Sequence, residues 1–439
     1  MWWLALLVLA PGSVDADVSA SGIDTRGLSL VVGRAARAPS YALAPTTPRA
    51  PASNMKILTA GAALARLGAD FRFVTRFVKT PDGDLVVVGD GDPSWSGRFF
   101  DGDPTAVMRR VAADLKSRGV VTVRNVVLDA SRFDDVVVHA DWPADQLERW
   151  YCAPVAGLVY NDSCWDVTVR PGARAGAAAL VEISPSLLRP GLVNRCETAA
   201  GGRGQIVHVG RANGGALTVR GRVLKTSRGV TANLTVVDPV RFFGGALKAA
   251  LEREGVVVTG RVRTGRAPAG AATVLFVRSR LRRALGVMLT NSQNLYAECI
   301  FKRLGVGTFG DAGRVGAAAL ARNGVDIGGL EWRDGSGLAH TNRVTARTLY
   351  DVLQRWRDEP AFVEALAAGG TGTLRKRYRE LGDRVRAKTG TIRGVSALSG
   401  YVTGRRGGRH VFVILCTGRS RARARALQDR IVARLSREP

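Results

Sequence analysis

Three short motifs, far apart in the chain but in a fixed order, constrain this sequence more than any other feature. They are Ser53-Asn54-Met55-Lys56, Ser292-Gln293-Asn294 and Lys388-Thr389-Gly390. The run that starts at Ser53 has apolar residues at helical spacing as far as Gly68. We therefore expect Ser53 at the amino-terminal end of a helix, with Lys56 one turn away on the same face. A serine, two lysines and nearby hydroxyl and amide groups are the components of acyl-transfer chemistry.

Lys56 is expected to activate Ser53. A serine hydroxyl attacks poorly unless a neighbouring base removes its proton, and a lysine can do so only if its pKa falls from about 10.4 toward about 7 to 8. Burial or a nearby cation lowers a lysine pKa, and Lys388 is the candidate cation. Backbone N–H groups at a helix N-terminus favour negative charge, so the amide of Ser53 is expected to form half of an oxyanion hole.

The first motif alone is weak evidence. A serine three residues before a lysine is expected by chance in a chain of 439 residues and is usually ordinary helix surface. The ordered set of three motifs is more specific and is typical of penicillin-binding proteins and serine β-lactamases. The third motif continues an alternating run, which predicts a strand whose glycine lets a substrate approach; a strand ending in a turn is the alternative. Residues 395–403 and 410–416 are expected to add two strands behind the site.

Other segments extend this pattern. They are Gly91-Asp92-Pro93-Ser94, residues 292–298 (SQNLYAE), residues 334–338 (DGSGL) and Gly400-Tyr401-Val402-Thr403. With them, nearly the whole chain resembles the class C low-molecular-mass penicillin-binding proteins, the D-alanyl-D-alanine carboxypeptidase/endopeptidase family. The resemblance implies a mixed α+β, serine β-lactamase/transpeptidase-like fold with an antiparallel sheet flanked by helices. It also implies a serine-type carboxypeptidase that uses no cofactor, acts on peptidoglycan stem peptides and binds β-lactams.

The resemblance assigns catalytic roles to four residues. Ser53 resembles the family's nucleophile, and Lys56 resembles its general base. Ser292 resembles the hydroxyl that relays protons toward the leaving amine, and Asn294 resembles a hydrogen-bonding partner of Lys56 and of the substrate amide. Gln293 stands where relatives often have Asp, and we expect little consequence because that side chain should point away from the substrate.

The resemblance also implies a set of substrate-binding residues. Lys388 and Thr389 resemble strand residues that position the terminal carboxylate of the substrate, next to the close approach allowed by Gly390. The Thr391 backbone N–H is expected to be the second oxyanion donor, with its hydroxyl near the carboxylate.

Asp145 lies in a segment (WPAD) where some relatives hold the free amino group of a diaminopimelate-containing stem. A solvated loop carboxylate or a helix cap is the alternative for Asp145. Ser336, between two glycines, is interpreted as part of a tight turn near the site.

The long separation between the first two motifs indicates an insert within a discontinuous catalytic domain. We expect the catalytic domain over residues 17–80 and 276–439 and the insert over residues 81–275. The insert is expected to hold two modules. Residues 90–150 are interpreted as a small βαβ unit with a helix over 107–118, and residues 151–275 as a β-rich module with one helix over 241–254.

The amino-terminal residues resemble a secretion signal. The apolar run over residues 2–10 is too short to span a bilayer and is followed by small residues, so residues 1–16 are interpreted as a signal peptide, with cleavage after Ala16 or Ala20. No Lys or Arg precedes the run, and a buried first strand is the alternative. The signal predicts a secreted, periplasmic or otherwise extracytoplasmic protein.

Cysteine and histidine spacing excludes other chemistry. The five cysteines form no C-x-x-C pair, and none of the four histidines lies in H-E-x-x-H, so neither a metal site nor a zinc peptidase is expected. Export would permit one disulfide. Cys152 with Cys164 is the candidate pair, and Cys164 with Cys196 is the second choice.

The chain is strongly basic, with 64 Lys and Arg against 37 Asp and Glu and a net charge of +27. Nucleic-acid binding is not expected, because the basic residues are spread along the chain and no nucleic-acid module is apparent. Acidic wall polymers and anionic membrane surfaces are simpler partners, and compositional bias is the alternative.

The tail over residues 419–437 has one apolar helical face, which we expect to pack on the catalytic sheet. Peripheral membrane contact through this basic helix is the minority interpretation.

Three functions fit the sequence. The first is a serine-type D-Ala-D-Ala carboxypeptidase, with DD-endopeptidase activity as an extension. The second is a serine β-lactamase, which shares the motifs but must deacylate penicillin quickly. The third is a non-catalytic basic protein that binds the cell wall, which the intact motifs argue against.

Overall fold

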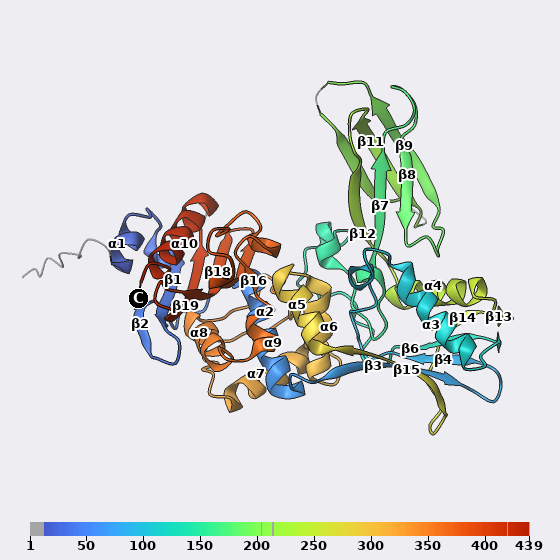
Figure 1. The fold of residues 1–439 in the computed structure, drawn as a ribbon, viewed down its shortest axis with the longest axis horizontal. Helices are drawn as coiled ribbons and strands as arrows, with labels where there is room; N and C mark the ends of the chain where they lie inside the picture. The colour runs from blue at the N-terminus through green and yellow to red at the C-terminus, as the bar shows by residue number, and fades with distance from the viewer. Residues whose placement is uncertain (1–12, 203, 213–214, 419, 439) are drawn as a thin grey trace, which may run out of the picture. The chain divides into compact units, whose positions relative to one another are not determined.

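The chain forms two compact units in a computed structural model that describes residues 13–202, 204–212, 215–418 and 420–438 (Figure 1). The discontinuous unit comprises the chain up to Phe71 and from Leu281 onward, and the inserted unit comprises Arg72–Arg280. The apolar run of the expected signal peptide lies outside the described residues. Each unit has its own hydrophobic core, and each is described by itself.

A six-stranded antiparallel sheet forms the centre of the discontinuous unit, in the order β16-β17-β18-β19-β1-β2. Its strands are β1 (Leu28–Arg34), β2 (Pro39–Leu43), β16 (Ala367–Ala368), β17 (Val385–Ile392), β18 (Val395–Thr403) and β19 (Arg409–Thr417). Strand β1 pairs with β19 from Leu28 opposite Cys416 to Arg34 opposite His410. Segments from both ends of the chain therefore share one sheet.

Helices cover both faces of this sheet. They are α1 (Val14–Ser19), α2 (Met55–Leu67), α5 (Leu281–Thr290), α6 (Asn294–Leu304), α7 (Phe309–Arg322), α8 (Ala346–Arg355), α9 (Pro360–Val363) and α10 (Arg421–Leu435). Helix α10 shares an apolar core with Leu398 and Phe412 on one face. Tyr401 points to the opposite face, because side chains alternate along a strand, and its hydroxyl donates to the Leu353 carbonyl of α8 at 2.6 Å.

The apolar side of α10 is covered by the sheet. Leu427, Ile431 and Val432 are fully buried, while the arginines near the start of the helix are exposed. The expected packing of the carboxy-terminal helix on the catalytic sheet is confirmed. No helix in the described part of the chain has the length and apolar character needed to cross a membrane.

The inserted unit contains a five-stranded sheet in the order β14-β6-β4-β3-β15. Its strands are β3 (Arg72–Lys79), β4 (Leu85–Val88), β6 (Val126–Asp129), β14 (Val262–Thr264) and β15 (Thr273–Arg280). Helices α3 (Thr105–Ser117) and α4 (Pro239–Arg253) share an apolar core with this sheet, and the short strands β5 (Thr122–Val123) and β13 (Val257–Val258) pair beside it. Strands β4, β6 and β14 run parallel to one another.

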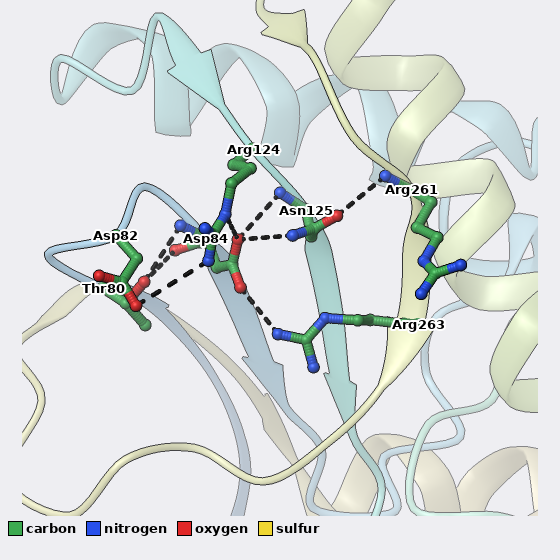
Figure 2. Close-up of polar contacts among 7 residues, drawn as sticks. All are labelled: Thr80, Asp82, Asp84, Arg124, Asn125, Arg261 and Arg263. Atoms are coloured by element: carbon green, nitrogen blue, oxygen red, sulfur yellow. Dashed lines mark hydrogen bonds and ion pairs between the residues drawn. The ribbon is translucent and has the colours of Figure 1, made fainter.

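Asp84 connects these parallel strands at their amino-terminal ends (Figure 2). Its buried carboxylate accepts hydrogen bonds from Arg124 Nε at 2.8 Å, from Arg263 Nη2 at 2.8 Å and from the side-chain amide of Asn125 at 2.9 Å. The Asn125 carbonyl oxygen in turn accepts from the Arg261 backbone N–H at 3.1 Å. The hydrogen bond from Arg124, followed by those from Asn125 and Arg263, holds the pKa of Asp84 far below its ordinary value.

The rest of the inserted unit is a small β-sandwich. One sheet has the order β12-β7-β8 and the other the order β10-β11-β9. The strands are β7 (Cys164–Arg170), β8 (Leu180–Ser184), β9 (Leu192–Ala199), β10 (Ile206–Arg211), β11 (Leu217–Leu224) and β12 (Val230–Thr235). Val167 and Val169 from one sheet pack with Val219 and Val223 from the other, because alternate side chains of each strand point inward.

The inserted unit is divided differently from the two expected modules. Strand β14 and helix α4 were expected within the β-rich module over 151–275, and most of β15 within the catalytic segment 276–439, but all three join β3, β4 and β6 in one sheet and core. Strand β3 was expected within the catalytic segment 17–80, yet it belongs to the inserted unit. The reason is long-range pairing: β3 and β15 lie antiparallel from Arg72 opposite Arg280 to Val78 opposite Thr273.

The predicted disulfide is wrong. All five cysteines are free and buried, including Cys152, Cys164 and Cys196. Cys152 ends a short 3-10 turn, Cys164 begins β7, and Cys196 points into the apolar core of the sandwich. Each thiol is therefore a small buried side chain, and burial raises the pKa of Cys152 to about 12.

Candidate active site

Ser53 lies in a 3-10 turn, η2 (Ala52–Asn54), that leads directly into α2. The expected helix is present, but its α-helical part begins at Met55, so Ser53 precedes it. Ala52 has a φ of 48°, in the left-handed region that a residue with a side chain rarely adopts. The side-chain amide of Asn54 donates to Ser399 Oγ on β18 at 2.9 Å. The turn is thus fixed to the sheet while Ser53 is presented at its apex.

Lys56 makes three hydrogen bonds in the centre of the site. Its Nζ lies 3.2 Å from Ser53 Oγ, 2.7 Å from Asn294 Oδ1 and 2.9 Å from the backbone carbonyl of Ser336. The lysine is fully buried. Burial lowers the pKa of Lys56 to about 7, even though the nearby carboxylates Glu298 and Asp334 favour its charged form. The amine is therefore balanced between its charged and neutral forms near neutral pH.

The second and third motifs meet at a separate hydrogen bond. Lys388 Nζ on β17 donates to Ser292 Oγ at 2.8 Å and to the Thr389 carbonyl at 2.8 Å. Ser292 has a φ of 62° in the connection between α5 and α6, whose first residue is Asn294. Lys388 is fully buried, and burial followed by the charge of Lys56 lowers its pKa well below the ordinary value. The structure thus brings Ser53, Lys56, Asn294, Ser292 and Lys388 into one connected site.

Strand β17 offers an open edge beside this site. It pairs with β18 along its whole length, but in the described chain its other edge pairs with β16 only at Arg386 and Ala387. Thr389 is half-buried, and Thr391 is exposed. At Gly390 an added Cβ would lie 2.8 Å from the Pro51 carbonyl, so glycine is needed where the strand passes the Ser53 turn. The unpaired backbone can receive an extended chain as an additional strand.

The loop Asp334–Leu338 closes the site behind Lys56. The Glu298 carboxylate accepts from the backbone N–H groups of Gly335 at 2.7 Å and Ser336 at 2.8 Å, and Asp334 accepts from Gly337 N–H at 2.7 Å. Burial, then repulsion from Asp334, raises the pKa of Glu298 to about 8. The sequence indicated the segments that hold these acids, but not that they hold the loop or that Ser336 contacts Lys56 through its backbone.

Asp145 belongs to the inserted unit. It is exposed in the short 3-10 turn Ala144–Gln146, where Gln146 Nε2 lies 3.5 Å from its Oδ2. The other candidate residues all lie in the discontinuous unit. Contact between Asp145 and a substrate stays a prediction.

Comparison with known proteins identifies the chain at the level of its family. The model of the D-Ala-D-Ala carboxypeptidase 3 (S13) family matches residues 20–438. This chain belongs to the S13 family. The family places it among the class C low-molecular-mass penicillin-binding proteins and confirms both the resemblance and the transpeptidase-like fold.

Two relatives and two solved structures illustrate the match. The chain is 35% identical over 421 residues to a D-alanyl-D-alanine carboxypeptidase of Actinomadura sp. strain R39, covering 88% of this chain and 76% of that protein. It is 26% identical over 447 residues to carboxypeptidase DacB of Mycolicibacterium smegmatis, covering 92% and 83%. Penicillin binding protein 4 (dacB) of Haemophilus influenzae has the same fold, with a TM-score of 0.79, 21% identity and coverage of 97% of this chain and 100% of that one. A predatory endopeptidase of Bdellovibrio bacteriovorus is more distant, with a TM-score of 0.52, 16% identity and coverage of 93% and 92%.

Proposed function

We propose that this S13-family enzyme removes the terminal D-alanine from peptidoglycan stem peptides through an acyl-enzyme on Ser53. The observation that carries the proposal is the set of contacts around Lys56. A neutral lysine amine has two N–H bonds and one lone pair. Asn294 Oδ1 and the Ser336 carbonyl accept the two N–H bonds, which leaves the lone pair for the hydroxyl of Ser53, 3.2 Å away.

The reaction follows from these positions. Lys56 removes the proton of Ser53 as Oγ attacks the carbonyl carbon of the scissile D-Ala-D-Ala bond. The backbone N–H groups of Ser53 and Thr391 stabilise the oxyanion of the tetrahedral intermediate. When the C–N bond breaks, the proton that Lys56 took from Ser53 passes through the hydroxyl of Ser292, held by Lys388 Nζ, to the leaving amine of D-alanine, and Lys56 becomes neutral again. A water molecule then gives a proton to Lys56 as its oxygen attacks the ester carbonyl, and Lys56 returns that proton to Ser53 Oγ when the ester C–O bond breaks.

The substrate is expected to bind along β17. Its peptide can extend the sheet at the open edge of this strand, and its terminal carboxylate can meet the hydroxyls of Thr389 and Thr391 in the field of Lys388. A β-lactam presents a carboxylate and a strained amide in the same arrangement, so penicillin is expected to acylate Ser53.

We also propose that the enzyme cleaves cross-linked stem peptides. An endopeptidase must accept a D-alanyl bond whose leaving group is a long side-chain amine, and Asp145 is the candidate for holding a free amino group of the stem. The change Asp145→Asn is expected to raise the KM for stems with a free amino group and to leave kcat unchanged. An equal effect on stems with a blocked amino group would contradict this role.

The proposed function is tested with defined muropeptides and a labelled penicillin. The wild type should release D-alanine from a pentapeptide stem and carry a stable penicillin adduct on Ser53, while Ser53→Ala should do neither. Ser117→Ala makes the same change on an exposed helix end of the inserted unit and should behave as the wild type. Rapid release of hydrolysed penicillin would favour a β-lactamase. A wild type that is silent in both assays would favour a non-catalytic wall-binding protein.

We also propose that the mature protein is extracytoplasmic, with a signal peptide removed after Ala16 or Ala20. Cleavage after Ala20 would remove the buried Val18 and Asp17, which pairs with Arg434 of α10 at 2.5 Å, whereas cleavage after Ala16 would keep both and remove Val14, which packs on the same core. Membrane contact through α10 would be electrostatic, because its apolar side is covered. Sedimentation with anionic vesicles at low salt tests this contact, and absence of binding would contradict it.

A further inference from the structure

The loop behind the candidate site reaches Lys56 through a single peptide unit. The carbonyl of Ser336 accepts from Lys56 Nζ at 2.9 Å, and the N–H of the same peptide unit, on Gly337, donates to Asp334 Oδ1 at 2.7 Å. Lys56, Asp334 and Ser336 are fully buried. A buried carboxylate and the amine of Lys56 therefore lie at opposite ends of one polar peptide group.

We propose that Asp334 is a positioning residue that acts on Lys56 through the Ser336–Gly337 peptide unit. The inference rests on the proposed role of Lys56 as the base. A hydrogen bond to a carboxylate is about twice as strong as one between neutral groups, and hydrogen bonds in a chain polarise one another. The carbonyl polarised by Asp334 is a stronger acceptor for a Lys56 N–H, which holds the lone pair of the amine toward Ser53.

Asp334 is itself rigidly held. Its Oδ2 accepts from the Ala339 N–H at 2.7 Å, and its Oδ1 also accepts from Asn342 Nδ2 at 2.9 Å. Asn342 Oδ1 accepts in turn from the Arg333 N–H at 2.9 Å. The carboxylate can therefore fix the direction of the peptide unit that faces Lys56.

The loop is also in contact with the turn that carries the nucleophile. Gly337 has a φ of 81°, and an added Cβ would lie 1.9 Å from the Ala52 carbonyl oxygen. Ala52 immediately precedes Ser53, so the same peptide unit lies against both the base and the backbone of the nucleophile. This arrangement explains why the orientation of the loop should matter for acylation.

A comparison of the two buried acids distinguishes a relay from a general electric field. The charged groups that face Lys56 are Glu298, Asp334 and Lys388, and Glu298 has a larger effect than Asp334 on the pKa of Lys56. However, Glu298 binds the N–H groups of Gly335 and Ser336, which precede the peptide unit that contacts Lys56. A field acting alone ranks Glu298 first, whereas the relay ranks Asp334 first.

The test measures the rate of acylation by labelled penicillin across pH in Asp334→Asn and Glu298→Gln. Each change keeps the size of the side chain and replaces the carboxyl group with an amide. Asp334→Asn is expected to slow acylation about tenfold at the plateau, the difference between a charge-assisted and a neutral hydrogen bond, and Glu298→Gln to slow it less. Removing the negative charge of Asp334 lowers the pKa of Lys56, so the acidic limb of the pH–rate profile should move to lower pH in Asp334→Asn, whereas Glu298, whose pKa is about 8, is largely protonated over that limb and Glu298→Gln should move it less. Asp92→Asn, which removes a buried carboxylate of the inserted unit, should leave rate and limb unchanged.

The outcomes separate this inference from the proposed function. If the wild type forms no adduct on Ser53, the proposed function fails. If the wild type is acylated but Glu298→Gln is slowed more than Asp334→Asn, or the acidic limb of Asp334→Asn does not move, only the relay is overturned. If Asp334→Asn does not fold, Asn342→Ala takes its place in the test. It removes a donor that competes for Asp334 Oδ1 and should move the acidic limb of the pH–rate profile to higher pH. An acidic limb that stays in place or moves to lower pH overturns the relay.

The outer face of the β10-β11-β9 sheet carries a row of basic side chains. Arg195 on β9 lies opposite Arg220 on β11, and Arg220 lies opposite His208 on β10, so the three side chains form one row across the strands. All three are exposed, because their sequence neighbours point into the sandwich core. Among the described residues, no carboxylate lies within 4.0 Å of Arg195 or Arg220. We call this set the cationic row.

The cationic row differs from the positions around it. On the same face, the next outward position places Glu197 on β9 opposite Arg222 on β11, and the other sheet of the sandwich also pairs its outward charges. On its outer face Arg170 pairs with Glu182 at 3.3 Å, and the Asn233 amide donates to Asp166. Like charges directly opposite one another on neighbouring strands destabilise a sheet. The cationic row therefore carries a cost that the companion sheet avoids, which is expected where a ligand supplies the missing negative charge.

We propose that the cationic row binds an anionic phosphodiester polymer. Guanidinium groups match phosphate oxygens in a two-pronged geometry, and a flat row of them can meet successive phosphates of an extended chain. The net charge of +27 would support the approach of such a polymer over longer distances. This proposal does not depend on the catalytic role of Ser53.

The test measures binding of purified poly(glycerol phosphate) to the full chain at several salt concentrations. The double change R195Q/R220Q is expected to weaken binding about tenfold or more and to lower the slope of log Kd against log salt by about two, one for each lost contact. R170Q/R228Q removes the same charge beside the other sheet and should have little effect. Equal losses in both double variants, or no loss in the first, would overturn the proposal. Tighter binding of DNA than of poly(glycerol phosphate) to the same row would overturn the choice of polymer.

Discussion

At the scale of single residues, the site depends on what surrounds the amine of Lys56. Burial removes the water that would stabilise its charge, while two acceptors fix the directions of its N–H bonds. Lys388 is equally buried but donates to Ser292. Two lysines in one site can therefore serve different purposes, one as a base beside the nucleophile and the other as a charge beside the relay hydroxyl.

The pH dependence of acylation should report the pKa of Lys56. Only the neutral amine can take the proton of Ser53, and burial lowers the lysine pKa to about 7. Penicillin acylation should therefore rise with pH through an acidic limb near pH 7 and reach a plateau above it. Rapid-quench measurements from pH 5 to 9 check this expectation. A rate independent of pH over that range would contradict Lys56 as the base.

A substitution at Gly337 should disable the site by backbone strain. Gly337→Ala places a Cβ 1.9 Å from the Ala52 carbonyl oxygen at a φ of 81°, so the loop or the Ser53 turn must move. A misplacement of about 1 Å commonly costs about a hundredfold in rate, and a loss of this size in penicillin acylation is expected. The matched control is Gly407→Ala, which has a similar φ of 86° but open space around the added Cβ. Equal activity of the two variants would show that the contact is unimportant.

At the scale of secondary structure, what an element can bind depends on which of its edges or faces is already covered by the rest of the unit. Strand β17 keeps an open edge only because β16 is two residues long and pairs at one end. Helix α10 buries its apolar side on the same sheet. In the inserted unit, Asp84 makes a polar connection between the parallel strands β4, β6 and β14 at their amino-terminal ends (Figure 2).

Loss of the Asp84 charge should destabilise the inserted unit. Asp84→Asn leaves Arg124 and Arg263 without their carboxylate partner. Because removal of one member of a buried pair typically costs about 3 to 5 kcal/mol and both arginines are half exposed, we expect about 2 kcal/mol of lost unfolding free energy. The folded-state pKa of Asp84 is depressed, so its contribution is present above about pH 4, the unfolded value, and is lost as pH falls. Urea titrations at pH 7 and pH 3 should show a larger difference between wild type and variant at pH 7, with part of it remaining at pH 3 because the folded-state pKa lies lower still.

At the scale of the whole molecule, the chain builds two units with separate apolar cores. The proposed catalytic residues other than Asp145 lie in the discontinuous unit, and the core clusters of the inserted unit contain only residues between Arg72 and Arg280. The stability of each core can thus respond to a different ligand or substitution.

Thermal unfolding should reveal this division. Penicillin bound to Ser53 should raise the melting temperature of one transition, and Asp84→Asn should lower that of the other, because a ligand stabilises only the structure that binds it. Differential scanning calorimetry of the full chain, with and without penicillin, makes the measurement. A single transition that both changes shift would contradict independent cores.

Much of the fold and the site was predictable from local patterns. The strands expected at 395–403 and 410–416 correspond to β18 and β19, and the helices expected at 107–118 and 241–254 correspond to α3 and α4. These elements have apolar periodicity that a short window of sequence contains. The ordered motifs predicted Ser53, Lys56, Ser292, Asn294 and Lys388 as site residues from positions close together in the chain, and the structure shows contacts from Lys56 to Ser53 and Asn294 and from Lys388 to Ser292.

Tertiary structure alone decided the rest. The pairing of β3 with β15, the sharing of one core by segments on both sides of the sandwich, and the free state of the cysteines depend on contacts between residues far apart in sequence. The peptide relay from Asp334 to Lys56 depends on the direction of one carbonyl group, which no side-chain pattern encodes. The sequence by itself determined which chemical groups are available and which segments are helix or strand. Only folding decided which groups are buried together. Burial lowers the pKa of Lys56, and the two acceptors packed around its amine fix the directions of its N–H bonds.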